Sequence, residues 1–157
     1  MYIRPLVDQS IRHILILRPG AIGDTLLTFP ALLLLRRHFP EAEIAVVGNR
    51  PALRLARDWG LADEVDAFGA DWVGDLFGDE PTTALRERLQ RYDLGIVWMH
   101  SVTAAGDLAT RLEAAGVGRA LPLVSFPTLN SQRHVADHLI DTLADLGITG
   151  PRPPVTL

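Results

Sequence analysis

One short loop carries the residues whose types are best suited to catalysis or ligand binding. Gly20, Gly23 and Asp24 form a Gly-x-x-Gly-Asp sequence that follows an apolar run and the basic residue Arg18. Glycines permit unusual backbone angles and let a bound molecule approach the main chain closely. A carboxylate at this turn would repel a phosphate from the start of the next helix, a position that otherwise favours anions. The loop therefore suits a different task, in which Asp24 accepts a proton from a bound hydroxyl group.

Asp24 also has a purely structural interpretation. Aspartate is among the best helix N-caps, and such a cap stabilises a helix by about 1 kcal/mol. Local sequence alone favours the cap, although one carboxylate can serve both roles. The loop matches neither common phosphate motif, because its spacing differs from G-x-G-x-x-G and no P-loop lysine follows it.

Four other residues are weaker candidates for ligand binding. Arg18 could pair with a carboxylate or phosphate of a ligand through its planar guanidinium. Alternatively, it could be a solvent-exposed residue at the end of a strand with no role in binding. His100 and Ser101 fall in a predicted strand-to-helix loop, where they would line a cleft or serve as a surface histidine and a helix cap. Arg133 could reach an anionic ligand or merely precede a helix. The histidines lack zinc-like spacing and the chain has no cysteine, so we expect no metal and no cofactor.

Alternating strands and helices would position these residues. Apolar patterns predict strands at 13–17, 43–47, 64–68, 93–98 and 117–121, with helices at 24–39, 51–59, 82–91, 101–115 and 135–146. Pro30 should kink or loosen the first helix. The order predicts a Rossmann-like α/β domain, with a parallel sheet and helices on both faces. Residues 14–17 and 94–97 are apolar throughout, so they are expected as inner strands.

The carboxyl ends of the strands should form the ligand-binding edge. Ligands of open α/β sheets bind beyond these ends. Three segments are therefore expected to meet there, namely 18–24, 99–102 and 123–126.

Composition restricts the partners. The chain has 157 residues, 48% of them apolar, which suits one domain with a packed core. Its net charge of −4 argues against nucleic acid, which requires a basic face. Residues 1–10 are too mixed for a signal peptide, and the uncharged stretch 25–35 falls short of the about 20 residues of a transmembrane helix. We therefore expect a soluble protein with no transmembrane segment.

The sequence resembles one known enzyme family. Residues 14–32, ILILRPGAIGDTLLTFPAL, are similar to the opening motif of the heptosyltransferase-like glycosyltransferases (glycosyltransferase family 9): an apolar strand, a basic residue, Gly-Asp, and a helix with Thr-x-Pro-Ala-Leu. Residues 91–97, RYDLGIV, resemble a later strand of that family. The segment from His134 to Ile148 resembles the last helix of the family's first domain. Residues 19–21 depart from the family pattern, because Pro, Gly and Ala stand where many members have Ser or Thr.

The resemblance implies half of a two-domain enzyme of the GT-B fold. Residues 1–149 would be the acceptor-side Rossmann-like domain and 150–157 the start of an interdomain linker, with the donor-binding C-terminal domain absent. The reaction implied is inverting, metal-independent transfer of heptose or a related sugar from a nucleotide donor to a lipopolysaccharide-type glycan or lipid-linked sugar acceptor. Asp24 would be the general base. The residues expected to bind substrate are Arg18, Gly20, Ala21, Ile22, Gly23, Thr25, His100, Ser101 and Arg133.

The implied location is the cytoplasm, including a peripheral position at the inner membrane. The isolated fragment is expected to be inactive. A different class stays open, since a borrowed fold could form a non-catalytic binding module or a truncated partner subunit. A nucleotide-binding domain is disfavoured by the missing phosphate fingerprint.

Overall fold

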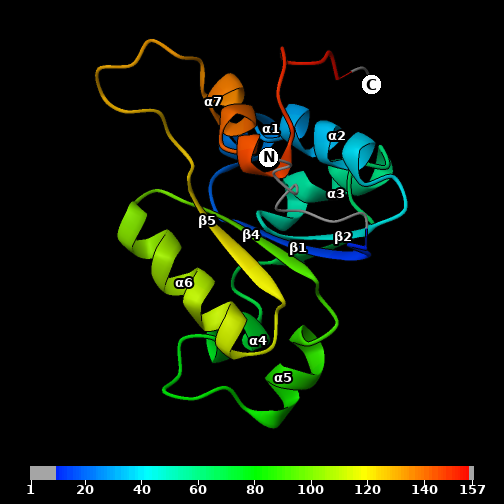
Figure 1. Ribbon diagram of the computed structural model, residues 1–157, viewed down its shortest axis with the longest axis vertical. Helices are drawn as coiled ribbons and strands as arrows, with labels where there is room; N and C mark the ends of the chain where they lie inside the picture. Colours follow the sequence, from blue (N-terminus) through cyan, green and yellow to red (C-terminus); the bar gives the residue numbers. More distant parts are fainter. Residues whose placement is uncertain (1–9, 156–157) are drawn as a thin grey trace, which may run out of the picture.

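A parallel sheet of five strands organises the chain (Figure 1). The computed structural model describes residues 10–155. The strands are β1 (His13–Arg18), β2 (Glu43–Gly48), β3 (Glu64–Ala67), β4 (Leu94–Met99) and β5 (Arg119–Val124). Their order in the sheet is β3-β2-β1-β4-β5, so β1 and β4 are inner strands, as the sequence predicted. The fold class is therefore confirmed as Rossmann-like α/β.

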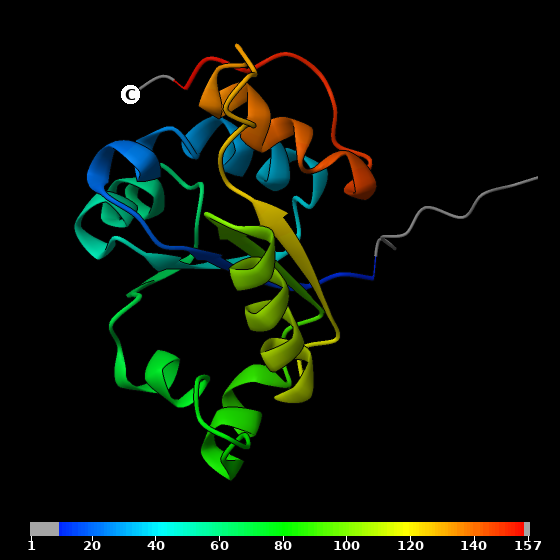
Figure 2. The ribbon, with the colours of Figure 1, turned by 90° about the vertical axis from the view of Figure 1, so that its left-hand side faces the viewer.

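Helices cover both faces of the sheet (Figure 2). The helices are α1 (Ile22–Leu26), α2 (Phe29–His38), α3 (Arg50–Asp58), α4 (Asp71–Asp75), α5 (Thr83–Leu89), α6 (Val102–Ala114) and α7 (Val135–Asp141), with a short 3-10 helix at Ala144–Leu146. One face packs against α2, α3 and α7, and the other against α4, α5 and α6. In the described part of the chain, every helix is too short or too polar to cross a bilayer.

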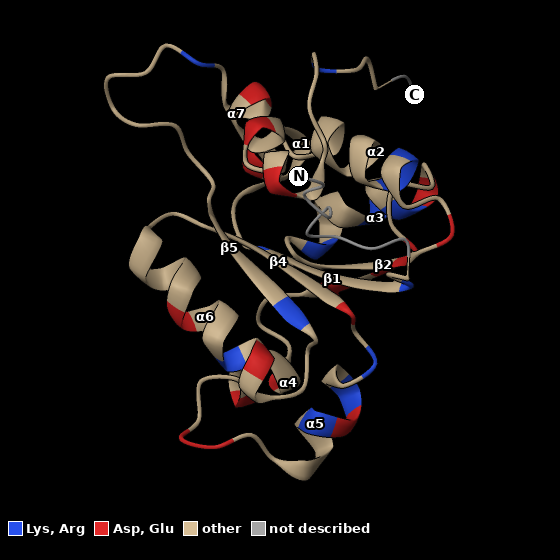
Figure 3. Ribbon diagram, in the orientation of Figure 1, with Lys and Arg blue, Asp and Glu red and all other residues tan. Residues whose placement is uncertain are grey.

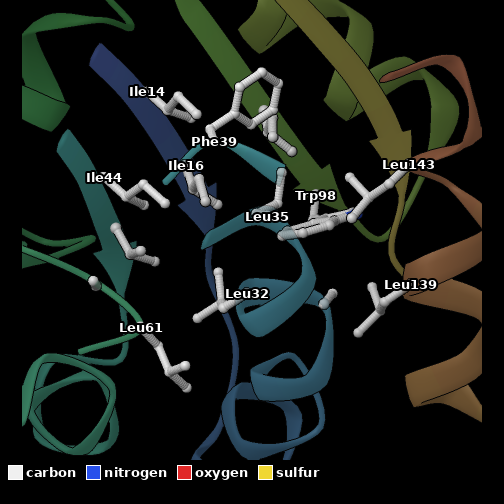
Figure 4. Close-up of a cluster of buried hydrophobic side chains, with 14 of the residues drawn as sticks. Ile14, Ile16, Leu32, Leu35, Phe39, Ile44, Leu61, Trp98, Leu139 and Leu143 are labelled. Atoms are coloured by element: carbon white, nitrogen blue, oxygen red, sulfur yellow. The ribbon is translucent and has the colours of Figure 1, made fainter. Parts of the chain in front are cut away.

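Alternate residues of each strand supply the two cores. Figure 4 shows Ile14 and Ile16 of β1 pointing toward α2, where they meet Leu32 and Leu35. Trp98 of β4 is fully buried in the same core, and its indole N–H donates to the Thr142 hydroxyl at 2.9 Å. The intervening strand residues face the opposite core. This two-sided burial explains why the inner strands read as continuous apolar runs.

The predicted first helix is broken in two. Residues 24–39 were expected as one helix loosened at Pro30, whereas α1 ends at Leu26 and α2 begins at Phe29. Pro30 has no N–H to continue the ladder, and it lies in the first turn of α2, where that N–H would have no helical partner. The prediction of a local disruption is confirmed, and the break proves complete.

Smaller boundary predictions need correction. The last strand runs over residues 119–124 rather than 117–121. The predicted helix at 135–146 divides into α7 and the 3-10 turn, where the Leu143 N–H donates to the Ile140 carbonyl at 2.9 Å, three residues back rather than four. The acidic region 69–81, for which no strand or helix was predicted, contains the short helix α4. In Figure 3 the connection from α4 to α5 carries acidic residues.

Candidate functional site

Three loops meet at the carboxyl edge of the sheet, as the sequence predicted. The Ser125 N–H donates to the Met99 carbonyl at 2.8 Å, which joins the ends of β4 and β5. The guanidinium carbon of Arg18 lies 5.8 Å from the centre of the Phe126 ring, which joins the end of β1 to the loop after β5. Because β1 and β4 are adjacent while their connections run to opposite sides, this edge contains the topological switch point of the sheet.

Gly20 lets the β1–α1 loop turn tightly around Asp24. Its φ of +151° lies in a region that residues with a side chain rarely adopt. A Cβ at this position would lie 3.0 Å from Asp24 Cβ and 3.1 Å from Asp24 Oδ2. Gly23 differs, since a Cβ there would meet no atom within 4 Å. Gly20 is thus the glycine whose missing side chain gives Asp24 its space.

Asp24 lies in the first turn of α1 but is not its N-cap. The N-cap position is Ala21, which has no side-chain acceptor, so the expectation that Asp24 caps this helix is wrong in detail. Instead, Asp24 Oδ2 accepts a hydrogen bond from the Ala21 N–H at 3.2 Å. That contact is one half of a capping box, made by the third helical residue. The half-buried carboxylate accepts no other hydrogen bond from residues 10–155.

Arg18 lies beneath this loop rather than in the open. The residue is 2% exposed, and its guanidinium donates to the Thr28 hydroxyl at 3.0 Å, the Pro19 carbonyl at 3.1 Å and the Asp24 carbonyl at 3.3 Å. Burial lowers the pKa of Arg18, while the negative charge of Asp24 acts in the opposite direction. All of these contacts of Arg18 are with the chain itself. Contact of Arg18 with a ligand stays a prediction.

The other loop residues expected to bind substrate differ in exposure. Ala21 and Gly23 are exposed, and Ile22 is 56% exposed despite its apolar side chain. Thr25 is fully buried, and its hydroxyl donates to the Ala21 carbonyl at 2.9 Å. Thr25 therefore contributes to the shape of the helix start, while the exposed positions lie at the surface of the edge.

The β4–α6 junction supplies the second predicted segment. His100 is exposed, and Ser101 is the N-cap of α6, accepting from the Ala104 N–H at 3.1 Å. The predicted capping role of Ser101 is confirmed. Ligand contacts by either residue stay predictions.

Arg133 lies before α7 and is paired with an acidic residue. Two guanidinium nitrogens contact the Asp141 carboxylate at 2.9 and 3.1 Å, and this pairing raises the pKa of Arg133. His134 is the N-cap of α7, with its Nδ1 accepting from the Ala136 N–H. An anionic ligand at Arg133 would have to compete with Asp141.

Sequence reasoning missed several residues of this edge. Asn49 caps α3 and also donates to the Gly20 carbonyl at 3.4 Å, which connects two neighbouring loops. Thr28 is 1% exposed and bonds both Arg18 and the Asp24 carbonyl. Ser125 is 1% exposed, and its hydroxyl has no hydrogen-bond partner among the described residues. Asn and Thr are common near strand ends, so their presence in a sequence does not identify such contacts. The contacts also depend on how separate loops are placed in space.

Metal ligands do not gather at the site. Within residues 10–155, no group of three histidines or carboxylates is close enough to hold a metal ion. Among the described residues, the edge instead presents the Asp24 carboxylate and the exposed His100 side chain.

Comparisons with known proteins support the resemblance at the level of fold. The structure is similar to a glycosyl transferase family 9 protein from Veillonella parvula, with a TM-score of 0.60 and 20% identity, over 91% of this chain and 43% of that one. It is also similar to the E. coli heptosyltransferase WaaC, solved with ADP-2-deoxy-2-fluoro heptose, with a TM-score of 0.56 and 21% identity, over 90% of this chain and 50% of that one. No protein-family model and no curated protein sequence matches the chain.

These likenesses define a class of domain. The chain has the α/β fold found in glycosyltransferase family 9 structures, and it spans about half the length of the solved chains that it matches. At such identities the likeness establishes a shared fold, while activity and substrates depend on the site.

Proposed function

We propose that this chain is the acceptor-side, N-terminal half of an inverting glycosyltransferase of the GT-B type, with Asp24 as general base. In this proposal residues 1–149 form the acceptor domain and 150–157 begin a linker to a donor-binding domain. The fold likeness over 91% of the chain supports the glycosyltransferase class. The observation that carries the catalytic role is the Asp24 carboxylate, which lies at the carboxyl edge and accepts one backbone hydrogen bond.

The proposed step is a direct displacement. Asp24 takes the proton of an acceptor hydroxyl as its oxygen attacks the anomeric carbon of a nucleotide sugar. The bond from that carbon to the nucleoside diphosphate breaks, and the diphosphate leaves with the electron pair. The stereochemistry inverts because one displacement occurs. A positioned base of this kind contributes about 10²–10⁴ in rate.

The acceptor domain is proposed to act without a donor site of its own. The loop after β1 carries a carboxylate where phosphates would otherwise bind a helix N-terminus, and it has no lysine. We therefore assign the nucleotide-sugar donor to a second, donor-binding domain of the complete gene product. The acceptor proposed is a lipopolysaccharide-type glycan or lipid-linked sugar, met in the cytoplasm or at the inner membrane surface.

The decisive experiment assays transfer by the complete gene product that contains these residues. The product is incubated with a panel of nucleotide sugars, including nucleotide-heptose, and with truncated lipopolysaccharide acceptors. Transfer of sugar from one donor with inversion at the anomeric carbon is expected. Absence of transfer with every pair, while the protein is folded, would favour the rival reading as a non-catalytic binding module.

Calorimetric titration of the 157-residue chain tests whether the nucleotide-sugar donor binds to this domain. We expect negligible heat with any nucleotide sugar, because the donor belongs to the other half. A saturable micromolar affinity would show that the donor has been assigned to the wrong domain.

A further inference from the structure

The break between α1 and α2 leaves one backbone carbonyl that needs partners. In a continuous helix the Asp24 carbonyl would accept from the N–H of Thr28. The Thr28 N–H instead donates to the Thr25 carbonyl at 3.0 Å, because the helix ends there. The Asp24 carbonyl is thus one of the orphan acceptors that every helix end creates.

Two buried side chains satisfy this carbonyl. The Thr28 hydroxyl donates to it at 3.0 Å, and an Nη of Arg18 donates to it at 3.3 Å. Arg18 Nε also donates to the Thr28 hydroxyl at 3.0 Å. These three bonds close a ring of Arg18, Thr28 and the Asp24 peptide group.

We propose that Arg18 and Thr28 are positioning residues that hold the main chain of Asp24 so that its carboxylate stays free for the acceptor hydroxyl. This inference rests on the proposed function only for its catalytic consequence. The ring grips the backbone of Asp24 and not its carboxylate, whose hydrogen bond comes from the Ala21 N–H on the far side of the turn. A buried guanidinium is costly to desolvate, and at 2% exposure Arg18 is held in place by bonds to the chain itself.

The geometry explains why both ring members are needed. Without Thr28, the Asp24 carbonyl would lose one of its two side-chain donors and Arg18 Nε would lose its acceptor. Arg18 also reaches back to the Pro19 carbonyl at 3.1 Å, so it fixes the first residue of the loop as well as the Asp24 end. The Gly20 turn between these two points is then held at both ends.

The first arm of the test measures order in the 157-residue chain and needs no activity. Backbone ¹⁵N order parameters are recorded for residues 20–24 in the wild type, Arg18→Met, Thr28→Val and Thr28→Ser. Values near about 0.85 are expected in the wild type and Thr28→Ser, and values below about 0.6 in Arg18→Met and Thr28→Val. Arg36→Met is the matched control, since Arg36 also donates to two backbone carbonyls but lies away from this loop.

The second arm measures transfer by the complete gene product. For Thr28→Val and Arg18→Met we expect kcat to fall by about 10²-fold, as for a small misplacement of a reacting group, with KM for the donor unchanged. Thr28→Ser should recover most of the lost turnover, because it restores the hydroxyl. Arg36→Met should retain turnover once the protein is folded.

The two arms separate the possible failures. If the wild type transfers no sugar, the proposed function fails and the order parameters alone decide the positioning role. Rigid residues 20–24 in both Arg18→Met and Thr28→Val would overturn the inference whatever the activity. If Arg18→Met does not fold, the Thr28→Val and Thr28→Ser pair decides, and equal order and turnover in these two variants would equally overturn it.

Discussion

Two arginine–aspartate clusters lie at opposite edges of the sheet and use their carboxylates differently. At the amino edge, Arg36 donates to Asp63 at 2.6 Å and to the Ala42 and Gly60 carbonyls. Asp63 also accepts from the Ile44 N–H at 2.8 Å, which secures the start of β2. At the carboxyl edge, Arg18 bonds the backbone of Asp24 and leaves its carboxylate with a single N–H donor.

The difference separates a structural carboxylate from a candidate functional one. Desolvation would raise the pKa of Asp63, but the hydrogen bonds from Ile44 and Arg36 outweigh it and lower that pKa. The Asp63 carboxylate is thereby committed to the fold. Asp24 retains acceptor capacity at the edge where ligands of open α/β sheets bind. The start of α1 has no side-chain N-cap, because Ala21 stands at that position and the Asp24 carboxylate bonds the Ala21 N–H instead.

The largest expected effect is on turnover, and it should differ between the same substitution made at Asp24 and at Asp63. In the complete gene product, Asp24→Asn should reduce kcat by about 10²–10⁴-fold, because the near-isosteric amide cannot accept the proton. Asp63→Asn should leave kcat close to that of the wild type at a temperature where both are folded. Steady-state transfer assays provide the measurement. Near wild-type turnover in Asp24→Asn would show that Asp24 only stabilises the start of α1, so that neither aspartate is catalytic.

A second prediction concerns the two glycines of the site loop. Gly20→Ala should destabilise the chain by roughly 1–3 kcal/mol, because its φ disfavours a side chain and the new Cβ would press on Asp24. Gly23→Ala is the matched control within α1 and should be neutral or stabilising by up to about 1 kcal/mol, since alanine favours a helix. Urea unfolding monitored by circular dichroism measures both. Equal effects would mean that the Gly20 turn does not constrain Asp24.

A third prediction tests the amino-edge cluster for stability. Asp63→Asn should reduce the free energy of unfolding by about 1–2 kcal/mol, since two charge-assisted hydrogen bonds are weakened at a partly exposed position. Asp24→Asn should cost less than about 1 kcal/mol, the usual range for a carboxylate in a first helical turn. Chemical denaturation of both variants gives the comparison. A larger loss in Asp24→Asn would identify Asp24 as the structural carboxylate.

A fourth prediction uses the neighbouring junction at the same edge. Ser101→Ala should destabilise the chain by about 1 kcal/mol, because α6 loses its side-chain N-cap. If Ser101 only caps α6, transfer by the complete gene product should persist in this variant. A fall in kcat comparable to that of Asp24→Asn would instead extend the catalytic machinery to the β4–α6 junction.

The smallest expected effect is the acid response of the amino edge. Because the pKa of Asp63 is lower in the folded chain than in the unfolded one, its contribution to stability is present above the unfolded aspartate pKa of about 3.9 and is lost as the pH falls through the folded value. The stability difference between wild type and Asp63→Asn should therefore shrink on acidification from pH 6 to about pH 3. Urea titrations across that range test this, and a constant difference would contradict it.

The strand and helix pattern was readable because it depends on local periodicity. The apolar runs of β1 and β4 identified the inner strands, and Pro30 marked the disruption of the first helix. The Gly-Asp loop identified the candidate residue at the correct edge. What the pattern could not give was the true start of α1, since Ala21 makes a poor cap and only the Asp24 contact to its N–H reveals the helix start.

The sequence by itself determined the α/β order, the two inner strands and the position of Asp24 beyond the end of β1, because side-chain periodicity and turn chemistry act over short stretches of chain. Only the tertiary structure decided that Arg18 is buried beneath Asp24, that Thr28 completes its ring of hydrogen bonds, and that Phe126 lies against the guanidinium. The orientation of a buried arginine depends on which carbonyls and rings surround it, and here those partners include a loop from the far side of β4. No local pattern encodes that neighbourhood, because parallel pairing brings together segments that lie far apart in the chain.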